Sequence, residues 1–214
     1  MAKPLTLSVV AATALSAATL CVVASLVACS SSSNGNLGDG GLGYSGEPPP
    51  SRVYLNASMT AGAAGADVCG VAEPSFLVIG SPAKSVADGE TQAGVLVKVS
   101  CSVTANTDGS FQVTAGVVSG DSSVTLMGRV TSTGTQTNVR GVFERSYFGH
   151  FEAADCTVRY DANPSMGVAL GRVWGTLDCP DMADASQSRM GPDGGPIARS
   201  CHAVAEVKLE DCVQ

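Results

Sequence analysis

Side chains that could act as catalysts are few in this 214-residue chain, because it contains only two histidines, His150 and His202. Nucleophilic catalysis needs a histidine beside a serine or cysteine, oriented by a third group. Residues 120–123 (GDSS) have the residue types of a hydrolase nucleophile, but neither the following glycines nor a late Asp-x-x-His that such enzymes need is present. A turn between strands explains this segment. We therefore expect no catalytic residues, with an exported hydrolase whose triad is assembled from distant loops as the alternative.

Three aspartates, Asp178, Asp181 and Asp184, recur at three-residue spacing and are candidate metal ligands. An EF-hand loop would also need an internal glycine and a terminal glutamate, which this spacing lacks. His202 beside Cys201 has the residue types of a zinc pair, but thiols of an exported domain are usually oxidised. We expect a solvated acidic loop, no metal and no cofactor.

Eight cysteines occur, and two of them, Cys21 and Cys29, lie in or beside an apolar N-terminal segment. The other six are Cys69, Cys101, Cys156, Cys179, Cys201 and Cys212. Behind an export signal, an even set without metal-type spacing predicts a disulfide framework formed in an oxidising compartment. Our best pairing is Cys179–Cys201, which would close the loop between two consecutive strands. Cys69–Cys101 and Cys156–Cys212 would complete the set, although the sequence cannot choose among the possible connectivities.

Residues 1–28 are predicted to be a targeting segment that does not contribute to the fold. One positive charge, Lys3, precedes a long run of Leu, Val, Ala, Thr and Ser. The run is longer than the usual apolar core of a signal peptide, so an uncleaved membrane anchor is an alternative. Small residues reduce its hydrophobicity, which favours a cleaved signal.

The targeting segment ends at Leu26-Val27-Ala28-Cys29, directly before a polar stretch of Ser, Asn and Gly. These four residues resemble the lipobox of bacterial lipoproteins, with Leu26 at the apolar position, Ala28 at the small position and Cys29 as the acceptor of diacylglycerol. The resemblance implies cleavage before Cys29 and anchoring in the cell envelope by acyl chains such as palmitate. Ser30 implies the outer membrane, in a host that has one. A secreted protein is the alternative.

Residues 29–50 are predicted to be a flexible tether between the anchor and the body of the chain. Ser and Gly dominate this segment, and three consecutive prolines stiffen its far end. A random coil of about 20 residues reaches on the order of 25 Å, which would hold a domain just clear of a membrane.

Period-two alternation dominates residues 51–214 and predicts strands with one buried face. In residues 94–104 (GVLVKVSCSVT), for example, apolar side chains at alternate positions oppose Lys98 and two serines. Turn-forming stretches separate the alternating runs, and no segment has a clear helical stripe. We expect a single all-β domain, an antiparallel sandwich or small barrel of about eight or nine strands.

Aromatic residues make up only 5% of the chain, and several are concentrated in residues 144–151 (ERSYFGHF). A turn at Gly149 could splay the rings outward as a binding loop with a large contact area. The candidate binding residues are Tyr147, Phe148, His150 and Phe151. The interpretation that we favour is that alternate rings pack beneath a hairpin and cap the core. Trp174 has the same ambiguity, and a buried strand tryptophan is favoured over a sugar platform.

The formal charge of −7 and the dispersed Lys and Arg residues argue against nucleic acid as a partner and against electrostatic adsorption to anionic lipid. The sequence predicts a lipid-anchored envelope protein whose non-catalytic β-domain has a structural or recognition role. Its partner would be another envelope protein or a surface glycan. The alternatives are the exported hydrolase and an assembly factor that pairs an exposed strand with a client.

Overall fold

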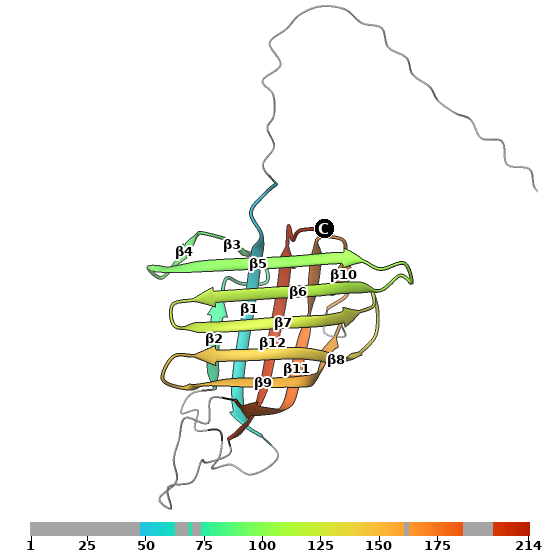
Figure 1. The fold of residues 1–214 in the computed structure, drawn as a ribbon. Helices are drawn as coiled ribbons and strands as arrows, with labels where there is room; N and C mark the ends of the chain where they lie inside the picture. Colours follow the sequence, from blue (N-terminus) through green and yellow to red (C-terminus); the bar gives the residue numbers. More distant parts are fainter. Residues whose placement is uncertain (1–47, 63–68, 70–73, 161–162, 186–198) are drawn as a thin grey trace, which may run out of the picture. The chain divides into compact units, whose positions relative to one another are not determined.

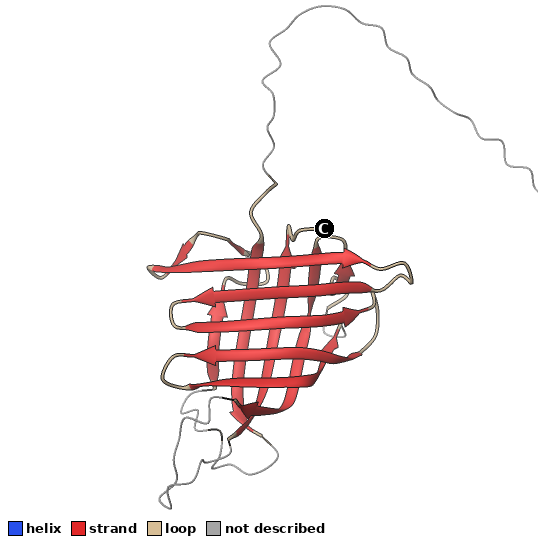
Figure 2. Ribbon diagram, viewed as in Figure 1, coloured by secondary structure: helices blue, strands red, loops and turns tan. Residues whose placement is uncertain are grey.

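The computed structural model describes residues 48–62, 69, 74–160, 163–185 and 199–214, which all belong to one compact unit. These residues form strands, turns and loops, so the predicted all-β class is confirmed (Figure 2). In the described part of the chain, no helix has the length and apolar character that crossing a membrane would require.

The described residues contain twelve strands, which form a single antiparallel sheet. They are β1 (Arg52–Ala61), β2 (Ser75–Ile79), β3 (Val86–Ala87), β4 (Thr91–Gln92), β5 (Val95–Ala105), β6 (Phe111–Ser119), β7 (Ser122–Val130), β8 (Gln136–Arg145), β9 (Gly149–Arg159), β10 (Gly167–Ala169), β11 (Arg172–Asp184) and β12 (Ser200–Glu210). Nine of them have five or more residues, in agreement with the eight or nine expected. The other three, β3, β4 and β10, are too short to be recognised from alternation.

The sheet folds over on itself into two layers. Its strand order is β2-β1-β12-β11-β9-β8-β7-β6-β5-β4, with β3 paired to β1 and β10 paired to β11. Strands β5 to β9 form one layer, and β2, β1, β12 and β11 form the other, whose strands cross behind the first in Figure 1. The result is a nearly closed, barrel-like sheet.

The core lies between the two layers, because alternate side chains of both point inward. In β12, for example, Cys201, Ala203, Ala205, Val207 and Leu209 are buried, and the residues between them are partly exposed. A cavity between the layers has a volume of about 10 Å³ and is lined entirely by apolar side chains. Such a volume is about the room that one water needs. This space therefore cannot hold a ligand.

The outer edge of β5 is covered by two other segments. The backbone of residues 89–90 exchanges hydrogen bonds with Val97 (2.9 and 2.8 Å), and the backbone of Val213 bonds to Cys101 and Val103 (3.0 and 2.9 Å). These contacts satisfy backbone groups that an open edge would offer to another strand.

Gln92 of β4 joins the two ends of the strand path through its side chain. The Gln92 carboxamide oxygen accepts a hydrogen bond from the Gly80 backbone N–H (2.7 Å), and its nitrogen donates to the Val78 carbonyl (3.4 Å). A side-chain amide thus supplies the donor and acceptor that a neighbouring strand would supply to the end of β2.

Three buried disulfides join the six body cysteines, as expected, but in a different pairing. The bonds are Cys69–Cys201, Cys101–Cys212 and Cys156–Cys179. The predicted Cys179–Cys201, Cys69–Cys101 and Cys156–Cys212 bridges are therefore wrong. Strands β11 and β12 are already paired neighbours in which Cys179 faces Ala203. The register of β9 against β11 instead brings Cys156 opposite Cys179, since Thr157 pairs with Asp178.

Candidate binding surface

The β8–β9 hairpin carries the aromatic cluster found in the sequence. Arg145 pairs with Gly149, and the Phe148 backbone N–H donates to the Arg145 carbonyl (3.0 Å), which closes a tight turn. Tyr147 lies at the tip with φ +65°, in the left-handed region, and its relative exposure is 109%. A bulky residue in this region is unusual, and strained backbone of this kind is concentrated at functional sites.

The rings of the cluster point in different directions. Phe151 is completely buried, and Phe148 is partly buried against the core with its ring centroid 5.5 Å from that of Phe151. The capping interpretation is confirmed for these two residues, because Phe151 occupies an inward position of β9. The alternative, in which the rings point outward as a binding loop, is wrong for Phe148 and Phe151. Of these rings, only that of Tyr147 is displayed to solvent.

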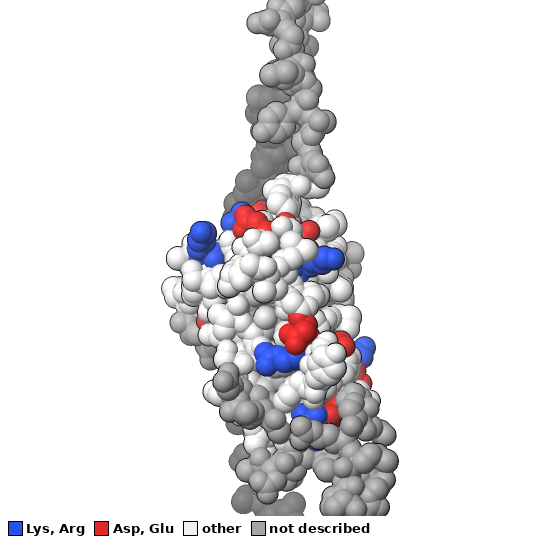
Figure 3. Space-filling view, turned by 90° about the vertical axis from the view of Figure 1, so that its left-hand side faces the viewer, with Lys and Arg blue, Asp and Glu red and all other residues white. Residues whose placement is uncertain are grey.

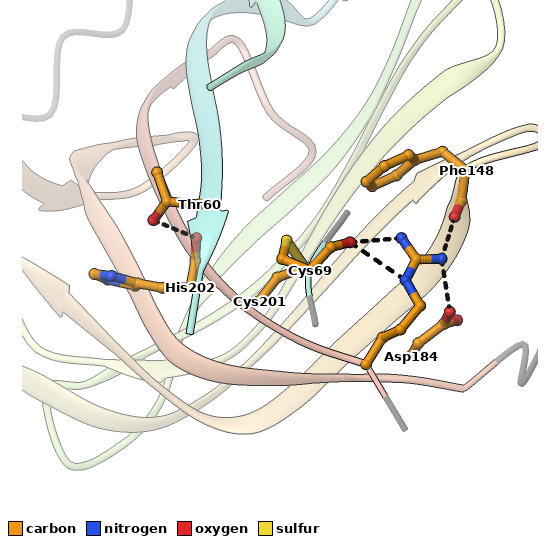
Figure 4. The surroundings of a disulfide bond; sticks show 7 residues. Thr60, Cys69, Phe148, Asp184, Cys201 and His202 are labelled. Carbon is orange, nitrogen blue, oxygen red and sulfur yellow. Dashed lines mark hydrogen bonds and ion pairs between the residues drawn. A yellow bond between two sulfur atoms is a disulfide. The ribbon is translucent and has the colours of Figure 1, made fainter. Parts of the chain in front are cut away.

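Arg199 fixes the turn from inside the domain. Figure 4 labels the three residues to which Arg199 bonds, Cys69, Phe148 and Asp184. The Arg199 guanidinium donates to the carbonyls of Phe148 (2.6 Å) and Cys69 (2.7 Å) and to the Asp184 carboxylate (3.1 Å). The same group lies 4.9 and 4.8 Å from the ring centroids of Phe148 and Phe151. Both charged side chains are almost fully buried, at 3% and 2% exposure, so these bonds replace their lost hydration.

Sequence analysis missed Arg199. One signal was available: the alternation of β12, continued back from the buried Cys201, places Arg199 on the inward side. A buried arginine needs a buried partner, and Asp184 supplies it. The sequence pattern instead makes Asp184 a candidate metal ligand.

A surface hollow of about 210 Å³ lies beside Tyr147 and is lined by residues 144–150. His150 is partly exposed there, with Nδ1 3.4 Å from Glu144 Oε2 and Nε2 4.0 Å from Glu152 Oε2. Arg140 bonds to Glu152 (2.6 Å) and lowers the pKa of that carboxyl. The hollow is open to solvent, its lining is more apolar than polar, and it is formed by one hairpin.

Other exposed apolar side chains lie on β2, β5 and β6. We define the hairpin-tip face as Val78, Val95, Leu96, Val118 and Tyr147, which are all exposed. The turns after β4, β6 and β8 lie at the same end of the first layer in Figure 1. In Figure 3, which views this side, charged side chains of both signs are scattered over a largely uncharged described surface.

The second layer carries a different constellation on its outer face. Asp178 accepts a hydrogen bond from Arg159 (2.5 Å) and lies 2.8 Å from His202 Nε2. Both histidines thus have carboxylates as side-chain partners, and neither bonds to a serine hydroxyl within the described ranges. The three aspartates do not converge either: among the described residues, no group of three or more His, Cys, Asp or Glu side chains could hold a metal ion.

Trp174 lies half-buried on this outer face. Its indole N–H donates to Glu206 Oε1 (3.1 Å), and the Tyr54 hydroxyl donates to Glu206 Oε2 (3.0 Å). Lys208 Nζ lies 5.2 Å from the centroid of the Trp174 ring. Burial, together with Glu206, raises the pKa of Tyr54. The polar atoms of both aromatic side chains are therefore engaged within the protein.

Cys29 and the predicted tether up to residue 47 lie outside the described residues. Comparisons of the chain with family models, curated proteins and solved structures find no match. Its function must therefore be inferred from the chemistry and geometry of the chain itself.

Proposed function

We propose that this chain is an exported, lipid-anchored protein of the bacterial cell envelope, whose β-domain is a rigid, non-catalytic module with a structural or recognition role. The observation that carries this proposal is the pairing of all six body cysteines in three buried disulfides. Such bonds form and persist in oxidising compartments outside the cytoplasm. The lipobox resemblance supplies the anchor, with Cys29 as the lipidated residue.

Two further features support a non-catalytic module. The space between the layers is filled with apolar side chains, and each histidine faces carboxylates in place of a nucleophile. The coverage of β5 also disfavours strand addition at that edge, which an assembly factor would use. What the domain offers to a partner is therefore side chains on its surface, with Tyr147 the most exposed of the large apolar ones.

The decisive experiment is the intact mass of the protein purified from membranes, measured with thiol alkylation before and after reduction. We expect a chain that begins at Cys29 and carries acyl chains, with the six body thiols alkylated only after reduction. A Cys29→Ser variant is the matched control, and it should lack the acyl mass. An unacylated wild-type N-terminus would refute the anchor, and thiols alkylated without reduction would refute the disulfide framework.

A further inference from the structure

Five of the seven large apolar side chains that are exposed in the described residues belong to the hairpin-tip face. Their exposures are 48% for Val78, 39% for Val95, 46% for Leu96, 41% for Val118 and 109% for Tyr147. Single exposed apolar side chains are normal on a protein surface, but a group at one end of a sheet indicates an interaction site.

Contacts between neighbouring turns join the segments that carry these residues. The Ser146 backbone N–H donates to the Asp121 carbonyl (3.0 Å), which joins the β8–β9 turn to the β6–β7 turn. A Cβ added at Gly120 would lie 3.4 Å from Val95, so the β6–β7 turn also touches the start of β5. The Gln92 side chain then continues the surface to Val78 of β2.

The shape and charge of this face favour contact with a fluid, uncharged surface over insertion into a complementary groove of a partner. The face is formed by side chains near the ends of β2, β5 and β6 and by Tyr147, which protrudes from the end of its hairpin. Arg145 and Asp121, on or beside the adjoining turns, have opposite charges. Charged side chains of both signs are scattered over this side of the domain in Figure 3, so neither sign dominates. Tyrosine is enriched where a bilayer meets water, because its ring is apolar and its hydroxyl is polar.

The root of the predicted tether lies next to this face. Ser51, where the described domain begins to pair, accepts a hydrogen bond from the Asp88 backbone N–H (2.8 Å). The following residue, Gly89, donates to the Val97 carbonyl (2.9 Å), one residue from Leu96. An anchor attached through residues 29–50 would therefore enter the domain beside β3 and the first half of β5.

We propose that the hairpin-tip face rests on the bilayer that carries the lipid anchor, with Tyr147 at the level of the headgroups. This inference rests on the proposed lipid anchoring and names the partner of the candidate binding surface. A tether with a reach on the order of 25 Å keeps the face at a high effective concentration near the membrane. Weak contacts from a few Val, Leu and Tyr side chains are then sufficient to orient the domain.

The test uses the lipidated full-length protein in phosphatidylcholine vesicles with brominated acyl chains, which quench nearby tryptophan. A Tyr147→Trp, Trp174→Phe double variant places the single tryptophan at the tip, and the native chain, with Trp174 on the outer face of β11, is the reference. We expect at least twofold stronger quenching of the tip tryptophan than of Trp174. Equal quenching at both positions in protein that floats with the vesicles would overturn the proposal. Failure to float would instead refute the lipid anchor.

A charge variant provides a second measurement in the same tip-tryptophan background. Leu96→Asp should reduce the quenching at least twofold, because a carboxylate opposes contact with the bilayer. Leu170→Asp is the matched control: Leu170 is also exposed, at 53%, but it precedes Gly171, whose N–H bonds to Val103 near the opposite end of β5. Equal effects of the two substitutions would contradict the proposed contact.

A photoreactive benzophenone side chain at position 147 identifies the occupant without a tryptophan substitution. In membranes, we expect adducts with the mass of a phospholipid. A discrete adduct with another protein, with a glycan or with a second copy of the chain would overturn the assignment to the bilayer and identify a different partner.

Discussion

Tyr54 and Tyr147 occupy contrasting environments in the same β-domain. Tyr54 is 5% exposed, and its hydroxyl donates to Glu206, which also accepts from Trp174. Tyr147 is fully exposed at the end of a hairpin and has a positive φ. The outer face of the second layer therefore uses its aromatic side chains to bind other parts of the protein, and the hairpin-tip face leaves its tyrosine available to a partner.

This difference implies that the residues that stabilise the fold and the residues that are available to a partner lie in separate regions. Substitutions in the disulfides, the buried ion pair or the Glu206 network should lower the free energy of unfolding. Substitutions on the hairpin-tip face should leave it nearly unchanged. Measurements of unfolding can therefore test the contrast before any partner is known.

Among substitutions in the stabilising region, loss of a long-range disulfide should lower the free energy of unfolding the most. Cys101 and Cys212 are 111 residues apart, so their bond restricts the unfolded chain more than Cys156–Cys179, at a separation of 23 residues. We expect Cys101→Ala/Cys212→Ala to lower the free energy of unfolding by about 4–5 kcal/mol and Cys156→Ala/Cys179→Ala by about 3 kcal/mol. Urea unfolding of both double variants measures the difference, and the reverse order would contradict the loop-entropy argument.

Loss of the buried Arg199–Asp184 ion pair beneath the hairpin should have the next largest effect on the free energy of unfolding. Arg199→Met leaves Asp184 and the carbonyls of Cys69 and Phe148 without its donors, so we expect a loss of about 3–5 kcal/mol. Arg140→Met is the matched control, because the Arg140–Glu152 pair is solvent-exposed and its loss should lower the free energy of unfolding far less. Equal losses in urea unfolding would show that burial of the Arg199 pair has no special role.

The Glu206 network provides the direct comparison with Tyr147. In Glu206→Gln, one carboxamide oxygen cannot replace two carboxylate oxygens as acceptors for Tyr54 and Trp174, and we expect a loss of about 2 kcal/mol. Tyr147→Ala should change the free energy of unfolding by less than about 0.5 kcal/mol. Thermal unfolding followed by circular dichroism measures both. A large loss in Tyr147→Ala would mean that the tip residue is structural.

The fold was predictable because alternation is a local signal. The run from Val95 to Val103 identifies both the strand and its buried face, and similar runs identify most long strands. The disulfide pairing was not predictable, because it depends on which strands become neighbours. Only the adjacency of β9 and β11, which are separated by β10 in the sequence, brings Cys156 opposite Cys179.

The candidate site was predictable only in part. Concentration of rings in residues 144–151 located the hairpin, and strand parity places Phe151 inside. The remaining features depend on contacts between distant segments. Arg199 reaches Phe148 across 51 residues of sequence, and the hairpin-tip face combines side chains from β2, β5, β6 and a turn. No local pattern specifies these contacts.

Tyr160 provides the most specific test of what a hydrogen-bond partner of a buried hydroxyl contributes to the free energy of unfolding. Its ring packs beside Gly175, where an added Cβ would lie 2.9 Å from Tyr160 Cε1. Its hydroxyl is buried and has no hydrogen-bond partner among the described residues. We expect Tyr160→Phe to raise the free energy of unfolding by about 1 kcal/mol, because an unsatisfied buried group is removed. Tyr54→Phe should lower it, because that change removes the bond to Glu206.

The pH dependence of stability provides a second test of the buried Tyr160 hydroxyl. Burial raises its pKa to about 12, against about 10 in an unfolded chain. Below pH 10 the hydroxyl is protonated in both states and contributes no pH dependence. Between pH 10 and about 12 the unfolded state loses this proton first, so stability should fall as pH rises. Alkaline unfolding curves should show a smaller fall in Tyr160→Phe than in the wild type. Identical curves would mean that the Tyr160 hydroxyl ionises as readily in the folded protein as in the unfolded chain.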